Sequence, residues 1–191
     1  MPAYPRVTLD SPEIKTRAEF GDLLNRRGLT GEAAEIGVHL GEFADTILSR
    51  WTGRTLHLVD PRQTAMPDYV DTIMGRDRDA DYEAAMARLS RHEGRFQVHR
   101  STSLETANRF ADNRFDFVYI DANHAHISVL ADVFAWWPKV RSGGILAGHD
   151  WANEWKKNVR RAVYELTTEL GLTVWVVWDH DGAGSWYVEK P

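Results

Sequence analysis

The chain has 191 residues, of which 43% are hydrophobic and 27% charged, with a formal net charge of −5 and no cysteine. A chain of this length fits one domain that buries about 70% of its unfolded surface, so it needs neither disulfides nor a structural metal to fold. The lack of cysteine excludes a disulfide scaffold, a thiolate zinc site and a cysteine nucleophile. The acidic balance argues against bulk nucleic-acid binding. Because no apolar run reaches the roughly 20 residues of a membrane span and residues 1–10 lack a secretion signal, we expect a soluble, cytoplasmic protein without membrane or nucleic-acid partners.

The first 30 residues are predicted to form an arm followed by one helix. Prolines among the first ten residues indicate a loose arm. Ser11 followed by Pro12 is typical of a helix N-cap with proline at the first helical position. This helix is predicted to run to about Arg27 and to end at Gly28, which suits the left-handed position after a helix.

Strand and helix patterns alternate after residue 30. Short apolar runs predict strands, and apolar residues spaced three or four apart predict helices between them. The predicted strands cover residues 33–38, 55–59, 96–99, 115–120, 144–148, 173–178 and 185–188, and the predicted helices cover residues 43–48, 82–89, 104–110, 127–137 and 159–170.

This alternation predicts a doubly wound α/β domain whose mostly parallel sheet is covered by helices on both faces. The last two strands have no helix between them, so at least one must be antiparallel, and residues 181–184 are predicted to be their hairpin turn. In the helix over residues 127–137, the apolar stripe is Ile127, Leu130, Phe134 and Trp137. Ligands of such sheets bind beyond the carboxyl ends of the strands.

The first of these strands ends in a glycine turn with the sequence EIGVHLG at residues 35–41. Gly37 can take a positive φ and let a ligand approach the backbone, and Gly41 lets the next helix pack close to the strand. His39 stands where the dinucleotide fingerprint has its middle glycine, which disfavours NAD or FAD because their pyrophosphate sits against bare backbone. Glu35 suits a cationic ligand better than a phosphate. A plain strand-to-helix turn is the alternative.

Asp60 ends the next strand, about 20 residues after the glycine turn. An acid at this place can accept hydrogen bonds from both hydroxyls of a ribose. Because Asp60 precedes Pro61, it can equally be a turn residue that caps its own loop.

Acidic and histidine residues gather at the ends of the fourth and fifth strands. Asp121 and Asp150 follow these strands, and their carboxylates converge if the strands are neighbours. Two like charges in one cleft indicate a shared proton or a bound cation such as Mg²⁺, Ca²⁺ or Mn²⁺. The alternative is that Asp121 and Asn123 cap the next helix while Asp150 caps the last one. His124 is placed to reach a substrate hydroxyl, while His126 and His149 are candidates for supporting or substrate-binding groups; a transition-metal site on these three histidines is a further alternative.

Together these motifs resemble the class I S-adenosylmethionine-dependent methyltransferases. Within that class they look most like the small metal-dependent O-methyltransferases of the macrocin and mycinamicin sugar type. The resemblance runs from about Gly31 to the C-terminus, and its motifs are EIGxxxG at 35–41, VD at 59–60, FVYIDxxH at 117–124 and GGILxGHD at 143–150.

The resemblance implies a methyltransferase domain over residues 31–191 that binds S-adenosylmethionine, with residues 1–30 as an N-terminal arm and helix. The implied reaction is divalent-metal-assisted O-methylation of a small hydroxylated molecule, such as a sugar or another natural product, with Mg²⁺ as the first candidate metal. His124 falls where such enzymes place a general base, and Asp121 and Asp150 fall on metal ligands. The implied cofactor-binding residues are Glu35, Gly37, Gly41, Asp60, Ser101, Ser103 and Asp121, with Asp60 on the ribose and Ser101 or Ser103 near the adenine.

The chain also departs from this family pattern. Trp151 stands where catechol-type relatives carry an asparagine metal ligand, which puts the third protein ligand in doubt. With no extra domain, a substrate lid must come from the N-terminal helix, the loop over residues 62–80 or a partner subunit. A homo-oligomer through the tryptophan-rich segments is possible, with core packing as the alternative. The rival functions are a nicotinamide-dependent oxidoreductase and a catalytically silent nucleoside-binding or assembly protein on the same fold.

Overall fold

A computed structural model of the chain describes residues 6–9, 11, 13–61, 77–152, 157–178 and 182–191. The strands are β1 (Arg6–Thr8), β2 (Glu32–Ile36), β3 (Thr55–Val59), β4 (Phe96–His99), β5 (Phe115–Ile120), β6 (Val140–Gly148), β7 (Thr173–Val177) and β8 (Ser185–Glu189). The α-helices are α1 (Phe20–Arg26), α2 (Glu42–Arg50), α3 (Arg78–Leu89), α4 (Ser103–Ala107), α5 (His126–Trp136) and α6 (Lys157–Leu170), and single 3₁₀ turns cover Arg17–Glu19, Ser90–His92 and Trp137–Lys139.

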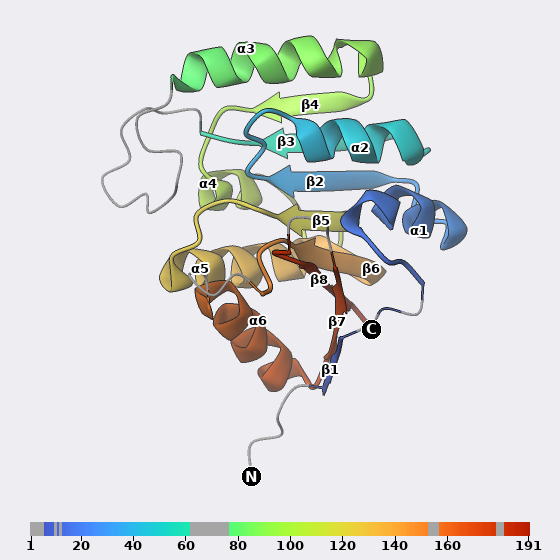
Figure 1. Cartoon of the computed structure of the whole chain (residues 1–191), viewed down its shortest axis with the longest axis vertical. Helices are drawn as coiled ribbons and strands as arrows, with labels where there is room; N and C mark the ends of the chain where they lie inside the picture. The colour runs from blue at the N-terminus through green and yellow to red at the C-terminus, as the bar shows by residue number, and fades with distance from the viewer. Residues whose placement is uncertain (1–5, 10, 12, 62–76, 153–156, 179–181) are drawn as a thin grey trace.

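The described strands form one eight-stranded sheet in the order β1-β7-β8-β6-β5-β2-β3-β4 (Figure 1). Every neighbouring pair is parallel except the two that involve β8, which runs antiparallel to both β6 and β7. The short connection from β7 to β8 forces this reversal, since parallel neighbours need a crossover of a dozen or more residues. The predicted mostly parallel sheet with an antiparallel C-terminal strand is confirmed.

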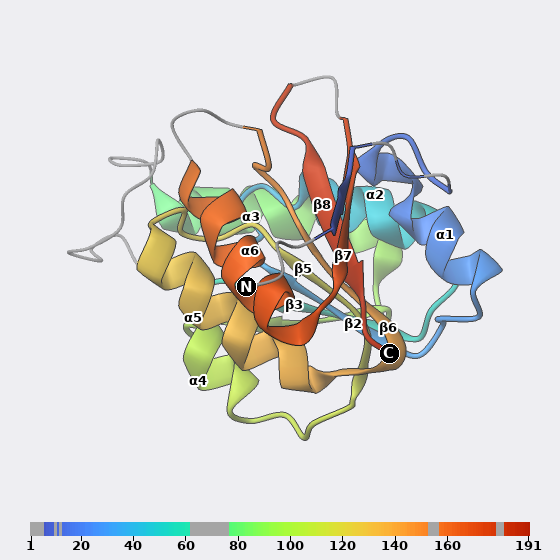
Figure 2. The same ribbon diagram turned by 90° about the horizontal axis from the view of Figure 1, so that it is seen from below.

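Helices cover both faces of the sheet. Figure 2 shows α1 and α2 on one side and α4, α5 and α6 on the other. The apolar core is divided accordingly: Phe20, Phe43 and Ile47 belong to a cluster on the first face, whereas Val133 and Val163 belong to a cluster on the second. Because both faces are buried, the central strand β5 is buried along its whole length.

The N-terminal segment differs from the prediction. Its arm contributes β1, which extends the sheet by pairing with β7. No helix follows Ser11 directly; α1 begins only at Phe20, after the 3₁₀ turn over Arg17–Glu19. Ser11 is buried, and its hydroxyl lies 2.8 Å from the Tyr187 hydroxyl while accepting from the backbone N–H groups two and three residues on. The serine therefore caps a turn that is anchored to the sheet. The helix ends before Gly28, which has a φ of 66°, as predicted.

The buried face of α5 was also predicted wrongly. Ile127 is 70% exposed and Phe134 41% exposed, although both belong to the apolar stripe. The face toward the sheet carries Val129, Val133 and Trp136 and includes the buried acid Asp132. A polar residue at a core position shifted the apparent stripe. Trp136 and Trp151, two of the tryptophans considered for an oligomer interface, lie in the core.

Two histidines on the neighbouring strands β3 and β4 contact each other, and of these His57 is buried and His99 half-buried. His57 Nδ1 lies 2.9 Å from His99 Nε2, and His57 Nε2 lies 3.2 Å from a carboxylate oxygen of Glu32. Burial is the main cause that lowers the pKa of both histidines, and the nearby charge of Arg114 acts in the same direction. Both rings also meet Phe110 edge-on, so an added proton has little solvent to stabilise it.

This pair predicts acid sensitivity of folding. Because each folded-state pKa is below the ordinary 6.5, the unfolded chain binds more protons as the pH falls below about 6.5. The free energy of unfolding is therefore expected to fall from pH 7.5 to pH 5.5 in urea titrations. The double variant His57→Gln/His99→Gln should show a smaller fall than the wild type; an equal fall in both proteins would contradict this account.

Candidate active site

The turn between β2 and α2 is locked against the loop after β5. Gly37 has a φ of 89°, as predicted, and a Cβ at this position would lie 2.1 Å from the backbone oxygen of Asp121. The Asp121 N–H also donates to the Ile36 carbonyl at 2.7 Å. The side of Gly37 on which a Cβ would lie is thus occupied by the Asp121 backbone, while Gly37 also lines the cavity described below. The predicted role of Gly37 toward a ligand stays a prediction. Gly41 has a φ of 71°, and a Cβ there would touch Leu89 of α3 at 3.3 Å.

Gly37→Ala is expected to destabilise the protein much more than a glycine change in open space. A left-handed backbone costs an L-residue about 1–2 kcal/mol, and at Gly37 the clash with the Asp121 backbone adds to that cost. We expect a loss of more than about 3 kcal/mol in the free energy of unfolding. Gly28→Ala is the matched control, because Gly28 has a φ of 66° and no atom within 4 Å of its added Cβ. Equal losses in urea unfolding would contradict the proposed packing.

Asp60 holds the same turn from the end of β3. Its Oδ2 accepts from the backbone N–H groups of Val38 and His39 at 3.0 and 3.2 Å, and its Oδ1 lies 3.1 Å from Arg78 of α3. His39 has a φ of 46°, a conformation that histidine tolerates better than most residues. Asp60 therefore caps the β2–α2 turn, and most of the loop that follows Asp60 lies outside the described residues. Contact with a ribose stays a prediction.

A cavity of about 430 Å³ opens beside this turn. Of the residues predicted to bind the cofactor, it brings together Gly37, Asp60 and Ser103. The rest of its described lining is largely apolar. It comprises Ile36, Val59, Pro61, Arg78, Thr102, Leu104, Ala122, Asn123, Ile127, Ser128, Ala131 and Asp132.

The other predicted cofactor residues are not among the described lining of this cavity. Glu35 is buried within β2, paired with Leu58 of β3 and Tyr119 of β5. Ser101 has its hydroxyl 2.6 Å from that of Thr106. Gly41 supports the α3 contact, and Asp121 lines a second, small pocket together with His124 and His149. Their roles toward the cofactor remain predictions.

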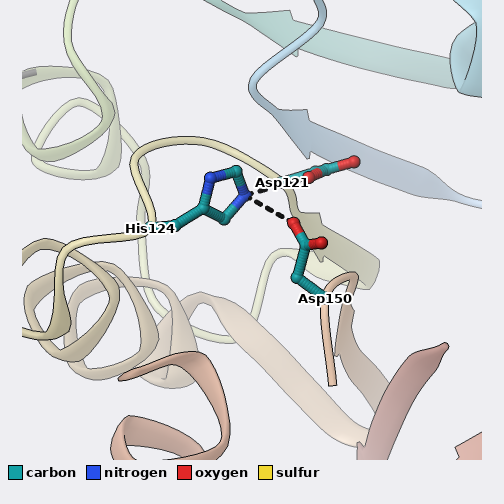
Figure 3. A group of neighbouring side chains, drawn as sticks. All are labelled: Asp121, His124 and Asp150. Atoms are coloured by element: carbon teal, nitrogen blue, oxygen red, sulfur yellow. Dashed lines mark hydrogen bonds and ion pairs between the residues drawn. The ribbon is translucent and has the colours of Figure 1, made fainter. Parts of the chain in front are cut away.

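Asp121 and Asp150 meet at the carboxyl ends of β5 and β6. These strands are parallel neighbours, with Ile120 paired with Gly148, so the residues that follow them lie side by side. Asp121, His124 and Asp150 each offer a ligand atom, and these atoms lie within 4.8 Å of one another (Figure 3). The convergence expected from the sequence is present.

Asp121 is not the N-cap residue of the helix that follows it. The N-cap position of α5 is Ala125, whose backbone N–H donates to Asn123 Oδ1 at 2.8 Å. Whether Asp150 caps the last helix lies outside the described residues, because residues 153–156 precede the described start of α6 at Lys157. Trp151 and Ala152, which follow Asp150, are not helical. Asp150 itself has a φ of 60°, in the left-handed region that few non-glycine residues adopt, although aspartate is found there more often than most. Such strain is concentrated at functional sites.

The histidines of this region divide into two groups. His124 Nε2 lies 2.8 Å from Asp150 Oδ2 and 3.4 Å from Asp121 Oδ1 (Figure 3). His149 Nδ1 is 3.8 Å from an oxygen of each acid. His126 turns away and pairs with Glu165 of α6 at 3.0 Å. The structure therefore places His124 and His149, but not His126, beside the two acids.

Two residues around the acids change what the sequence suggested. Arg17, from the 3₁₀ turn before α1, lies 3.9 Å from Asp121 Oδ2, and no sequence motif marks it as a site residue. Trp151 is buried and packs edge-on against Tyr164, so its side chain takes no place among the candidate ligands. Burial and then the charge of Asp121 raise the pKa of the Tyr119 hydroxyl.

The substrate lid predicted for residues 62–80 lies mostly outside the described residues. Its last residues, from Arg78, form the beginning of α3.

Comparisons with known proteins agree with this geometry. A family model described as a methyltransferase domain matches residues 34–151. An O-methyltransferase from Bacillus cereus, solved with S-adenosylhomocysteine, has 17% identity and a TM-score of 0.65 over 94% of this chain and 84% of its own. TomG from Streptomyces achromogenes, an O-methyltransferase involved in tomaymycin synthesis and solved with S-adenosylmethionine, has 16% identity and a TM-score of 0.66 over 92% and 79%. The O-methyltransferase NovP has 15% identity and a TM-score of 0.67 over 91% and 77%. A search of curated proteins gives no match.

The family model covers more than half of the chain, and the chain therefore belongs to the methyltransferase-domain family. Its sheet order and antiparallel C-terminal strand make it a class I S-adenosylmethionine-dependent methyltransferase. The nicotinamide-dependent alternative is not favoured. None of the helices in the described ranges has the length and apolar character needed to cross a membrane.

Proposed function

We propose that this enzyme transfers a methyl group from S-adenosylmethionine to a hydroxyl oxygen of a small molecule, with help from a divalent cation at Asp121 and Asp150. The observation that carries this proposal is the meeting of the two carboxylates next to the cavity. Ala122 and Asn123 line the cavity, and they directly follow Asp121 in the chain. A cofactor in the cavity and a cation at the acids would thus be neighbours.

The cavity suits the nucleoside part of the cofactor. Its apolar lining, including Pro61, Leu104 and Ile127, fits the flat faces of a base. Asp60 is placed for the ribose hydroxyls, and Ser103 for the base. The Bacillus cereus protein and TomG were solved with S-adenosylhomocysteine and S-adenosylmethionine, which supports the choice of cofactor. The remaining predicted cofactor residues, Glu35, Gly37, Gly41, Ser101 and Asp121, complete the proposed site.

The acid pair fits a hard divalent cation. Two carboxylates whose oxygens converge, with Arg17 as the nearby positive side chain, need further positive charge to be stable together. Carboxylate oxygens are the ligands that Mg²⁺ prefers, and an imidazole in the same set also admits Mn²⁺. With Trp151 turned into the core, His149 Nδ1 is the candidate for a third protein ligand. A bound cation lowers the pKa of a hydroxyl group and orients it.

His124 is proposed as the general base. Its Nε2 faces the space between the two carboxylates, where an acceptor hydroxyl would lie. Proton transfer to this nitrogen leaves an imidazolium that Asp150, 2.8 Å away, stabilises. The other demand of methyl transfer is alignment of the acceptor oxygen with the methyl group, and such positioning can contribute about 7–11 kcal/mol.

The acceptor is proposed to be a small hydroxylated compound, such as a sugar or another natural product. The support is the resemblance to the macrocin and mycinamicin type of enzyme, together with a structural neighbour involved in tomaymycin synthesis. We also propose that the protein forms a homo-oligomer in which a partner subunit covers the substrate site.

Titration calorimetry with S-adenosylhomocysteine and with NAD tests the proposal. The wild-type protein is expected to bind S-adenosylhomocysteine and not NAD. Binding of NAD alone would overturn the proposed cofactor. Binding of S-adenosylhomocysteine without methyl transfer to any hydroxylated acceptor, with Mg²⁺ or Mn²⁺ present, would favour the catalytically silent alternative.

A further inference from the structure

One acid that lines the cavity, Asp132, has none of the cofactor, metal or base roles proposed so far. Asp132 belongs to α5 and lines the cavity, although it is only 5% exposed. Burial raises its pKa to about 6. At neutral pH the carboxylate is therefore charged in a largely apolar environment, which is costly unless hydrogen-bond donors surround it.

Ser103 is the polar side chain that supports this carboxylate. Trp136 Nε1–H donates to the Ser103 hydroxyl oxygen at 2.9 Å, which leaves the Ser103 proton available to another acceptor. Hydrogen bonding from Ser103 partly offsets the effect of burial on the pKa of Asp132. Among the described residues, Ser103 is the hydrogen-bonding side chain that acts on the pKa of Asp132. An ionised carboxylate can accept about four hydrogen bonds, so most of its capacity is left for a ligand in the cavity.

We infer that Asp132 recognises the exocyclic amino group of the cofactor's adenine. This inference rests on the proposed function, because it requires S-adenosylmethionine in the cavity. The ribose-binding candidate Asp60 and the reaction centre at Asp121 fix where the other parts of the cofactor lie. The adenine ring is therefore expected in the remaining part of the cavity, which is lined by Ser103 of α4 and Asp132 of α5. An amino group offers two N–H donors to a carboxylate, whereas a 6-oxo base would present an oxygen that Asp132 repels.

Paired binding measurements test this assignment. The probes are S-adenosylhomocysteine and S-inosylhomocysteine, which differ at the 6-position of the base, titrated calorimetrically at pH 7.5. The wild type is expected to prefer the adenosyl compound by at least about 10- to 100-fold, the usual value of a hydrogen bond to a charged group. Asp132→Ala should weaken adenosyl binding by a similar factor and remove most of the preference.

Asp132→Asn is expected to gain affinity for one of the two compounds, and loss of folding cannot produce such a gain. A carboxamide can accept from the amino group or, after rotation, donate to the oxo group, so this variant should bind the inosyl compound more tightly than the wild type does. Asp112→Asn is the control, because Asp112 is an exposed residue paired with Lys139 outside the cavity, and it should keep the wild-type preference.

The possible results separate this inference from the proposed function. Adenosyl binding by the wild type, with an unchanged preference in both Asp132 variants, would overturn the role of Asp132 and leave the cofactor assignment standing. Failure of the wild type to bind either compound would overturn both.

Discussion

His124→Ala is expected to lower kcat for methyl transfer by about 10²–10⁴-fold, the usual contribution of a general base. A neutral hydroxyl is a weak nucleophile, and His124 Nε2 is the nitrogen that faces the two acids. Affinity for S-adenosylhomocysteine should stay near the wild-type value, because His124 is not among the residues that line the cavity within the described chain. Transfer from labelled cofactor to an acceptor that the wild type uses gives kcat, and calorimetry gives the affinity.

His126→Ala is the control for this experiment. His126 is two residues away on the same segment, but its side chain pairs with Glu165 of α6. Its kcat should stay close to that of the wild type. A His124→Ala enzyme with wild-type kcat would remove His124 from the chemistry, and equal losses in both variants would indicate a structural effect on this segment.

Asp150→Asn and Asp121→Asn are each expected to remove the response of turnover to added Mg²⁺ or Mn²⁺. Loss of one carboxylate removes half of the negative charge that the two acids offer, and we expect kcat to fall by about 10²–10³-fold. Asparagine is the suitable replacement at position 150, because it has the same shape as aspartate and also tolerates the φ of 60° observed there.

The wild type treated with a chelator provides the comparison. Its turnover should fall to about the level of the asparagine variants and return when Mg²⁺ or Mn²⁺ is added, whereas the variants should not respond. A variant whose turnover still rises with added metal to the wild-type level would contradict the assignment of these acids as ligands.

The strands and helices of the central domain could be predicted because each carries a local pattern. The run from Phe115 to Ile120 is apolar throughout because β5 is buried on both faces. β1 has no such pattern, since its three exposed or half-exposed residues acquire their structure only by pairing with β7, far away in the chain. The buried face of α5 was missed for a related reason, because Asp132 occupies a core position that an apolar pattern cannot reveal.

The candidate site could be predicted where it depends on strand ends. Asp121 and Asp150 follow neighbouring parallel strands, so topology alone brings them together. Arg17 and Arg78 reach the site from other elements, and only the three-dimensional packing shows their contacts with Asp121 and Asp60. The same holds for Gly37, whose missing Cβ makes room for the Asp121 backbone, a contact between residues 84 positions apart (121 − 37).

The central claim is that Asp121 and Asp150 hold one divalent cation next to the cofactor. A crystal grown with S-adenosylhomocysteine and Mn²⁺, measured for the anomalous signal of manganese, tests it most directly. We expect one manganese peak bonded to a carboxylate oxygen of each acid, with the sulfur of the cofactor product in the adjoining space. Bound S-adenosylhomocysteine with no manganese peak between the two acids, or with the peak at other residues, would contradict the account.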